Sequence, residues 1–575
     1  MMTKPHFGII AIYAFMAKGV LNLTLLLVAL LSAFFAAQSL YFFLNFNSAL
    51  PCWDIWNYLR DYYYPYLDGS YHFLDLLAKY NGHIIATTQI LLCIDGLLFH
   101  MAGIFPVAVS YASLLVIANL MAAMAVGKAS RKNWAIATVI FLGLTWSISQ
   151  NANFILEFNV QWALVHLFAI VCVLSAALAL EGDHRADQWR WYALAFASDF
   201  LAIFSLASGV LVIVPLLAIP LLRRKTIQRP YVALVLFHLC LAAAAYLQPG
   251  GSPPYTAPFR DMALYLFLFL GNCLGGLLKL KATVGAILVI LLIGFAARGA
   301  WISLRRKESL GFGEAIALAI GIYVLSEGVI AAYGRSWYGI EQAASSRYAT
   351  ASVIGVASLF VLAWRVYRSI SLRILLAGLF GAVLWASNAY KPYIQGWLYR
   401  VHAADDIAFA LINGTFPVDK MKLAAFGSPE SLGPVVRRAA ALGLGSFSPS
   451  AAKYRPPMNN LVSLDPKALA PCRSGLDGVS MTPNMLEVQG WAASPTKTGD
   501  NWILAYNGAG ILVGYTRSSH ARPDVAMLYR DLGSVQVGFD LFLARGRIGA
   551  SGLRLVVASS SAAPSACVYT QKLPS

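Results

Sequence analysis

The sequence predicts an α-helical polytopic membrane protein that ends in a β-sandwich domain. Its 575 residues are 59% hydrophobic and only 12% charged, with a mean hydropathy of +0.65. Soluble domains carry about 25% charged residues. Apolar runs that could form membrane-spanning helices, which need about 20 residues, recur as far as Tyr390. Beyond residue 470 they give way to short alternating segments between Gly, Pro and Asn, a pattern typical of strands.

The first apolar run, Val20–Leu44, is predicted to be a retained signal anchor. Lys4 and Lys18 precede it, and no small-residue cleavage site follows a short apolar core. With the N-terminus inside, this run delivers residues 45–83 to the outer face as a large first loop.

About eleven crossings are expected in all, because a spanning helix needs about 20 apolar residues. The expected spans are Val20–Leu44, Phe105–Val126, Trp134–Gln150, Leu156–Leu180, Trp191–Ala207, Val210–Leu222, Tyr231–Leu247, Val284–Trp301, Ala315–Tyr333, Tyr348–Val366 and Ile374–Tyr390. Val210–Leu222 is the weakest of them, since it is short and contains Pro215. Two further apolar stretches, Ile84–Ile104 and Asp261–Leu280, are expected to dip into the outer leaflet without crossing.

Four basic clusters set this topology, because Lys and Arg collect in cytoplasmic loops. The clusters are Lys128/Arg131/Lys132, Arg223/Arg224/Lys225/Arg229, Arg305/Arg306/Lys307 and Arg365/Arg368/Arg373. If neither ambiguous stretch crosses, every cluster is cytoplasmic and the C-terminus lies outside. The net charge of +17 is then explained by membrane topology, and we expect no nucleic-acid partner.

The first outer loop carries the first candidate catalytic residue, Asp54. It sits between Trp53 and Trp56, roughly ten residues beyond the first span. A carboxylate that is partly desolvated at the lipid boundary has a raised pKa and can act as a general base. The alternative is an ordinary structural residue of an aromatic membrane interface.

Two other outer segments hold candidate site residues. In the first, Asn81 and His83 lead into an apolar stretch, where His83 could orient a phosphate; Asn81-Gly82 alone would be a turn. In the second, Glu157 and Asn159 lie at the mouth of a span. An ionisable residue at membrane depth is a functional candidate by default, although Glu157 could instead lie in solvent.

The segment "GRSWYGIEQAASSRYAT" gives the strongest signal for a binding site. It places Arg335, Glu341 and Arg347 on the outer face, and Tyr348 follows at the head of a span. Guanidinium groups match phosphate oxygens, so two outer arginines favour recognition of an anionic head group. The alternative is an Arg335–Glu341 ion pair that folds the loop.

The chain beyond the last span is expected outside the membrane. Residues 391–470 are predicted to be a helical linker region, and residues 471–575 a β-sandwich with runs such as "VQVGFDLFLA". Cys472 and Cys567 bracket this last region, which suggests one disulfide in an oxidising compartment. No cysteine pair has metal-ligand spacing.

Several short motifs resemble those of a group of poorly characterised bacterial polytopic proteins. They are "NGHIIATTQILLCIDGLLF", "EFNVQ", Ala207–Gly209 ("ASG") and "SSRYAT". The plan of residues 1–390, with an acidic first outer loop followed by many helices, is similar to that of the GT-C superfamily of membrane glycosyltransferases. One departure is that Asn81-Gly82-His83-Ile84 stands where the group has Asn-Glu-His-Arg, which removes an acid and a base.

The resemblance implies transfer of a sugar from a polyprenyl-phosphate donor to a periplasmic glycan or lipid acceptor, in a bacterial inner membrane. Asp54 would be the general base, and Arg335 and Arg347 would hold the donor phosphate. No cofactor is assigned, and a divalent metal ion is left open. One alternative is a transporter or flippase of lipid-linked saccharides, which would need polar residues inside the spans; Asp199, His238 and Glu327 are the main candidates. The other is a non-catalytic envelope scaffold.

Overall fold

The computed structural model divides the chain into two compact units, and each is described by itself. It describes residues 6–127, 130–182, 185–246, 257–274, 278–425, 429–456, 469–493, 501–529, 536–548, 552–559 and 566–569. Unit 1 comprises Met1–Phe46, His72–Leu92 and Phe105–Trp397, and unit 2 comprises Asn47–Tyr71, Cys93–Ile104 and Leu398–Ser575. Most of the first outer loop therefore belongs to the same unit as the C-terminal region.

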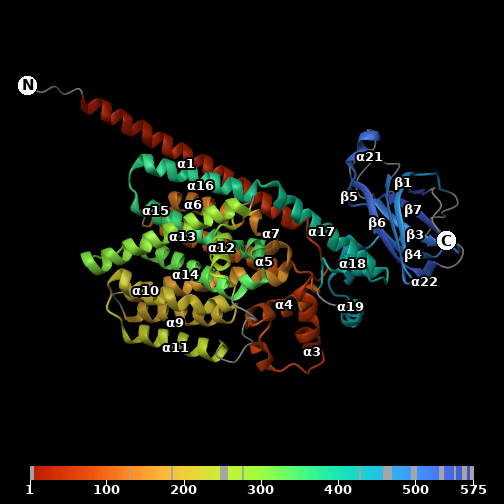
Figure 1. Cartoon of the computed structure of the whole chain (residues 1–575), viewed down its shortest axis with the longest axis horizontal. Coiled ribbons are helices and arrows are strands. Elements are labelled where there is room, and N and C mark those ends of the chain that lie inside the picture. The colour runs from red at the N-terminus through yellow and green to blue at the C-terminus, as the bar shows by residue number, and fades with distance from the viewer. Residues whose placement is uncertain are drawn as a thin grey trace, which may run out of the picture. The chain divides into compact units, whose positions relative to one another are not determined.

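Unit 1 is a bundle of long helices (Figure 1). These are α1 (His6–Asn45), α5 (Ile104–Val126), α6 (Arg131–Thr145), α8 (Val160–Glu181), α9 (Arg185–Ile203), α10 (Ile213–Arg223), α11 (Arg229–Tyr246), α12 (Phe259–Leu270), α13 (Leu278–Trp301), α14 (Phe312–Arg335), α15 (Ala349–Val366) and α16 (Ile370–Asn388). Helices α1 and α16 lie side by side, and α1 also packs against α6.

Within the described residues, eight helices are long and apolar enough to cross a membrane, or nine if the bent pair Arg131–Thr145 and Ile148–Ile155 is one span. This is fewer than the expected eleven. The expected spans Trp191–Ala207 and Val210–Leu222 do not qualify, and Trp134–Gln150 qualifies only as part of the bent pair. Helix α9 carries charged residues, including Asp187 and Arg190, and α10 is only 11 residues long. The stretches predicted not to cross hold only short helices, α4 (Ala86–Phe99) of 14 residues and α12 of 12.

The described residues of the four basic clusters lie at one end of unit 1. Arg223 pairs with Glu181 at 2.7 Å, and Arg224 donates to the carbonyl of Ser303 at 2.6 Å. These contacts join the ends of α8, α10 and α13. Arg365 packs against Gly127 and Gly313, which brings the ends of α15 and α5 and the start of α14 to the same place. Four clusters gathered at one end are consistent with a shared cytoplasmic side.

The polar segments between the helices meet at the opposite end of unit 1. Thr87 donates to Ser205 at 2.9 Å, and Asn153 donates to the carbonyl of Arg347 at 3.1 Å. Asn272, which follows α12, donates to the carbonyl of Ser345 at 2.6 Å. The segments that the sequence analysis singles out around residues 83, 157 and 335–348 are therefore gathered at this polar end.

The helical part of unit 2 is held together by polar contacts between distant segments. Its main helices are α2 (Asp54–Tyr58), η1 (Leu59–Tyr63), α3 (Tyr64–Leu67), α18 (Val418–Met421) and α19 (Pro429–Leu442), while α17 (Lys391–Ile412) runs from unit 1 into unit 2. The Tyr64 hydroxyl donates to the carbonyl of Val435, and Tyr454 donates to Asp405 at 2.6 Å. The outer-loop helices thus dock onto the segment before the strands.

The C-terminal region contains two four-stranded antiparallel sheets with strand orders β1-β2-β6-β5 and β4-β3-β7-β8. The strands are β1 (Arg473–Met481), β2 (Met485–Ala493), β3 (Asn501–Asn507), β4 (Leu512–Arg517), β5 (His520–Ala521), β6 (Gln536–Ala544), β7 (Leu553–Ser559) and β8 (Ala566–Val568). Buried residues of both sheets, such as Val488, Ile503 and Leu541, form one core. This two-sheet arrangement is the one that the alternating runs predict.

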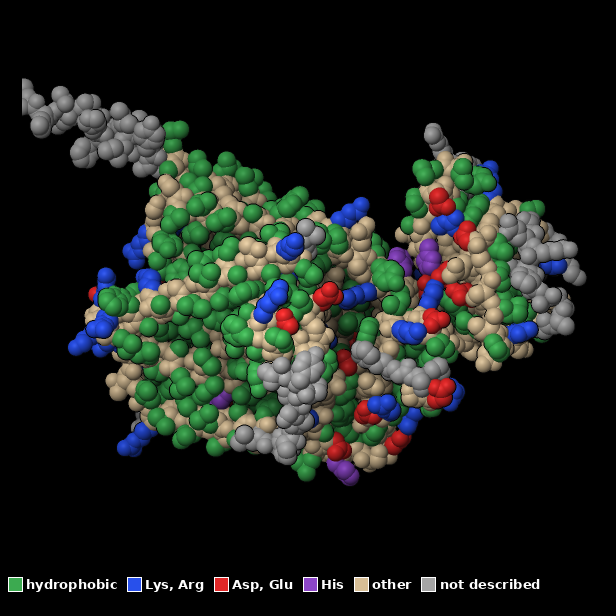
Figure 2. Space-filling view, viewed as in Figure 1, with side chains coloured by type: hydrophobic (Ala, Val, Ile, Leu, Met, Phe, Trp, Pro, Cys, Tyr) green, Lys and Arg blue, Asp and Glu red, His purple; other side chains and the backbone are tan. Residues whose placement is uncertain are grey.

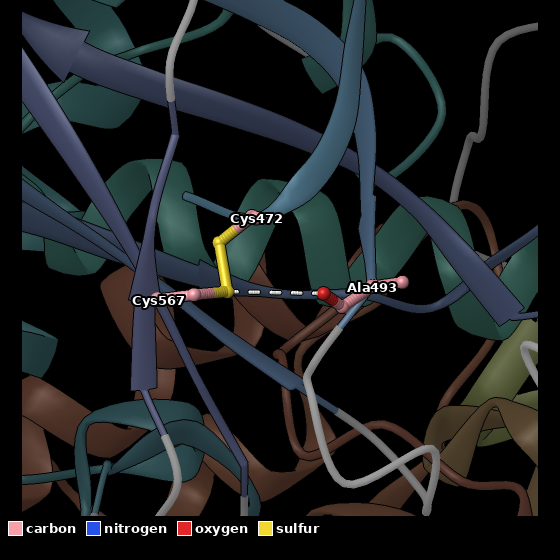
Figure 3. Close-up of a disulfide and its surroundings, with 3 residues drawn as sticks. All are labelled: Cys472, Ala493 and Cys567. Atoms are coloured by element: carbon pink, nitrogen blue, oxygen red, sulfur yellow. Dashed lines mark hydrogen bonds between the residues drawn. A yellow bond between two sulfur atoms is a disulfide. The ribbon is translucent and has the colours of Figure 1, made fainter. Parts of the chain in front are cut away.

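A disulfide joins Cys472 and Cys567, whose Cα atoms are 5.0 Å apart. Figure 3 shows the bond beside the carbonyl of Ala493. Cys472 immediately precedes β1, and Cys567 lies in β8, so the bond ties the first strand of one sheet to the last strand of the other. A cross-link between strands so distant in sequence restricts the unfolded chain.

Candidate anion site at the polar end of unit 1

A tight turn places His83 at the polar end of unit 1. Tyr80 and His83 exchange backbone hydrogen bonds of 2.7 and 2.9 Å, and Asn81 and Gly82 both have positive φ angles. Asn-Gly is the pair that this type of turn favours. Asn81 is exposed and supplies turn backbone, while its predicted role in binding stays a prediction.

Two arginines and a tyrosine surround this histidine. Arg335, the last residue of α14, donates from Nη2 to Nε2 of His83 at 2.8 Å and from Nη1 to the Tyr348 hydroxyl at 3.2 Å. Arg347 donates from Nη2 to the same hydroxyl at 3.3 Å, with its guanidinium 5.0 Å from the Tyr348 ring centre. The structure therefore brings together four residues that the sequence analysis selected from three separate positions.

The cluster contains hydrogen-bond donors that lack acceptors. Because His83 Nε2 accepts from Arg335, the proton of the neutral ring lies on Nδ1. This Nδ1 and the Nε of Arg347 are buried and hydrogen-bond to none of the described residues. Two N–H groups beside two guanidinium groups form a site that is complementary to an anion.

The charge of His83 is controlled by its surroundings. Burial, together with the nearby positive charges of Arg335 and Arg347, lowers the pKa of His83 to about 4. His83 is therefore neutral at pH 7. Its Nε2 can accept the hydrogen bond from Arg335, and the two arginines supply the positive charge of the cluster.

Neither arginine forms an ion pair with a carboxylate within the described part of the chain. Glu341, the partner in the alternative interpretation, is exposed, and no Arg335–Glu341 pair forms. An arginine that is partly buried without an acid partner is costly unless an anion compensates it. This absence favours the binding interpretation over the loop-folding one.

Aromatic side chains enclose the tyrosine of the cluster. The Tyr348 ring packs edge-on against Trp162 at 5.1 Å between centres and lies 5.4 Å from Phe269. Burial raises the pKa of Tyr265, the neighbouring Tyr348 raises it further, and the two arginines oppose the change. The Tyr348 side chain is buried, and its hydroxyl accepts hydrogen bonds from both guanidinium groups.

The segment that contains Glu157 and Asn159 lies beside the cluster and hydrogen-bonds to the backbone at Arg347. Asn153 donates to the carbonyl of Arg347 and to Thr350 at 2.9 Å, which fixes the backbone at the start of α15. Asn159 donates to the carbonyl of Ala152 at 3.0 Å and so holds its own loop. Glu157 is buried, with 5% of its surface exposed, and is not the solvated residue of the alternative interpretation.

Asp54 belongs to unit 2, whereas His83 and the two arginines belong to unit 1. It is the first residue of α2 and is half-buried. The preceding Trp53 has a φ of 55°, a strained conformation for a bulky residue. Its predicted role as a general base stays a prediction.

Asp95 is a buried acid that the sequence alone did not single out. Asp95, in α4, is fully buried, and its Oδ2 accepts a hydrogen bond from the backbone N–H of Gly103 at 2.9 Å. The signal was an acid within the apolar run "LLCIDGLLF". Its contact holds the turn after α4, where His100 and Met101 both have positive φ angles.

The acids inside the long helices are paired with histidines. His166 Nε2 lies 2.9 Å from Glu327 Oε2, and His238 Nδ1 lies 2.7 Å from Asp199 Oδ1. The second nitrogen of each ring faces a backbone carbonyl and therefore carries a proton. Each pair then shares one further proton and is neutral overall, which lowers the cost of burying it.

Unit 2 holds a group of residues that could bind a metal ion. The ligand atoms of Asp406, His520 and Asp540 lie within 4.8 Å of one another. Lys420 forms ion pairs with both carboxylates. Burial lowers the pKa of His520, but hydrogen bonding to Asp406 outweighs burial, and the pKa is raised overall. With Lys420 in place the group is already compensated, so its chemistry fits an ion-pair network between α17 and the strands better than a metal site.

Comparisons with protein-family models, curated proteins and solved structures find no match to this chain.

Proposed function

We propose that this chain transfers a sugar from a polyprenyl-phosphate donor to a glycan or lipid acceptor at the outer face of a bacterial inner membrane. The observation that carries the proposal is the Arg335–Arg347 cluster at the end of unit 1 opposite the basic loops, where neither guanidinium group pairs with a carboxylate of the described residues. A leaving phosphate gains negative charge during transfer, and fixed guanidinium groups stabilise that charge.

The position of the cluster suits a donor that is anchored in lipid. Arg335 ends α14, and Arg347 lies just before α15, two helices that are long enough to span a membrane. In a bilayer that both helices span, their meeting point would lie at the membrane boundary, which is where the phosphate of a polyprenyl donor would be. The aromatic residues around Tyr348 are also typical of this boundary.

The alternative of a transporter has less support. A transport path needs polar groups that face a route through the bilayer. Among the described residues, the acids Asp199 and Glu327 are instead buried and hydrogen-bonded to histidines. A general base would complete the transferase, and Asp54 is the candidate that the sequence supplies.

Binding of undecaprenyl phosphate to the purified full chain, measured by native mass spectrometry, tests the proposal. Arg347→Gln and Arg335→Gln should each weaken binding by about tenfold, because each removes charge-assisted hydrogen bonds worth about 1.5–3 kcal/mol. Arg229→Gln, which removes an exposed arginine from the opposite end, is the matched control. If all three variants bind as the wild type does, the cluster is not the donor site.

A further inference from the structure

A cavity with a cationic rim lies at the other end of unit 1, away from the proposed donor site. A cavity of about 920 Å³ opens among α1, α6, α15 and α16. Its lining includes Lys132, Arg365, Arg368 and Arg373 and contains no Asp or Glu. Figure 2 shows Lys and Arg side chains gathered at the left end of the helical unit.

The cations are available to a ligand. Lys132, Arg365 and Arg368 form no hydrogen bond or ion pair with any residue that the structure describes. Arg373 is partly engaged, because its guanidinium donates to the carbonyl of Tyr367 at 3.2 Å and lies 4.9 Å from the Trp364 ring centre. The rim of the cavity therefore carries several positive charges that nothing in its lining compensates.

The Arg365 guanidinium occupies space that two glycines leave open. A Cβ atom on Gly127 or on Gly313 would lie 2.9 Å from its Nη2 atom, so neither position can carry a side chain without displacing the guanidinium. Gly127 also has a φ of 67°, which other residues rarely adopt. The absence of side chains at these two positions therefore leaves room for the Arg365 guanidinium beside the cavity.

The polarity of the cavity changes with depth. Lys132 is the second residue of α6, whereas Phe141 lies nine residues further along, about 13 Å at 1.5 Å per residue. On α15 and α16, Arg365 and Arg373 lie near the helix ends, and Phe360 and Phe380 lie deeper in the bundle. Each of these three helices therefore presents a cation at the rim and an aromatic ring inside.

We infer that this cavity binds an anionic phospholipid of the leaflet at the basic end of unit 1, with the phosphate at the rim and an acyl chain along the apolar wall. A cationic rim over an apolar interior matches the head-to-tail polarity of such a lipid. Basic pockets between membrane helices on the cytoplasmic side bind acidic head groups by the same chemistry. The positive-inside rule assigns this end to the cytoplasmic leaflet.

The test compares retention of lipids by the full chain in mild detergent, measured by native mass spectrometry. The wild type should retain added phosphatidylglycerol in preference to phosphatidylcholine. The double variant Arg365→Gln/Arg368→Gln should retain it at least about tenfold less, since each arginine near a lipid phosphate contributes about 1 kcal/mol. Arg306→Gln/Lys307→Gln removes equal charge at the same end but outside the cavity lining, and should change little.

A second variant tests the apolar wall independently of charge. Ala137→Phe adds bulk to the lining of α6 without altering any cation, and should also lower retention of phosphatidylglycerol. Equal retention of the two lipids by the wild type would overturn the inference, as would equal losses from the two charge variants. A third result would also overturn it: the wild type retains undecaprenyl phosphate in preference to phosphatidylglycerol, and the Arg365→Gln/Arg368→Gln variant loses that preference. The occupant would then be the donor lipid.

Discussion

Arg335 donates a hydrogen bond to Nε2 of His83 across 252 residues of sequence, at 2.8 Å. The bond fixes which ring nitrogen carries the proton and leaves Nδ1–H directed at no acceptor among the described residues. The Asn-Gly turn that places His83 and the end of α14 that places Arg335 therefore act as one unit. This pairing links the predicted phosphate-binding loop to the apolar segment after the first outer loop.

The first prediction concerns pH. His83 has a folded-state pKa of about 4, below the value of about 6.5 for an unfolded histidine. The stability that it contributes is present above pH 6.5 and is lost as the pH falls towards 4. The thermal unfolding temperature of the full chain should fall over that window, and by less in His83→Gln. Equal falls in both proteins would show that His83 titrates normally.

The second prediction concerns the general base. Asp54→Asn keeps the shape of the side chain but cannot take a proton, so it should lower sugar transfer by at least about a hundredfold, the lower range for general-base catalysis. Binding of undecaprenyl phosphate and the amount of folded protein should not change. Asp61→Asn, which removes an exposed loop acid paired with Arg60, is the control. Transfer at the wild-type rate by Asp54→Asn would exclude this residue as the base.

The third prediction concerns topology. Ser130 and Thr226 are exposed beside basic clusters, whereas Arg260 is exposed at the start of α12. In a background without the exposed Cys240, cysteine at 260 should react with a membrane-impermeant maleimide added to intact cells. Cysteine at 130 or 226 should react only after lysis. Efficient labelling of 130 or 226 in intact cells would contradict the shared cytoplasmic side. Ser303 is unsuitable for this test because it is fully buried.

The fourth prediction concerns the disulfide. Cys472 and Cys567 are 95 residues apart, so breaking their bond should destabilise the two-sheet region by about 4.7 kcal/mol, the chain-entropy value for a loop of this length. Cys472→Ser/Cys567→Ser should lower its unfolding temperature and make it sensitive to proteolysis. Cys52→Ser, at a cysteine outside any disulfide, is the control. If the double variant is as stable as this control, the cross-link contributes nothing.

Local sequence signals predicted much of this structure. Apolar length predicted most of the long helices, alternation predicted the two sheets, and Asn81-Gly82 marked a turn. The charges of α9 and the shortness of α10 were visible, but hydropathy alone overcounted these segments as spans.

Contacts between distant segments were the part that the sequence left open. Nothing local indicated that Arg335 would hydrogen-bond to His83 and Tyr348 rather than pair with Glu341, or that His166 and His238 would pair with Glu327 and Asp199. The Asp406, His520, Asp540 and Lys420 group likewise forms only when α17 meets the strands. Such pairings depend on tertiary packing, which periodicity and composition do not encode.

A cryo-electron microscopy map of the full chain in nanodiscs with undecaprenyl phosphate tests the proposed donor site. We expect phosphate density within hydrogen-bond distance of the Arg335 and Arg347 guanidinium groups and of His83 Nδ1. Phosphate density elsewhere, with Arg335 and Arg347 still hydrogen-bonded only to His83 and Tyr348, would contradict it.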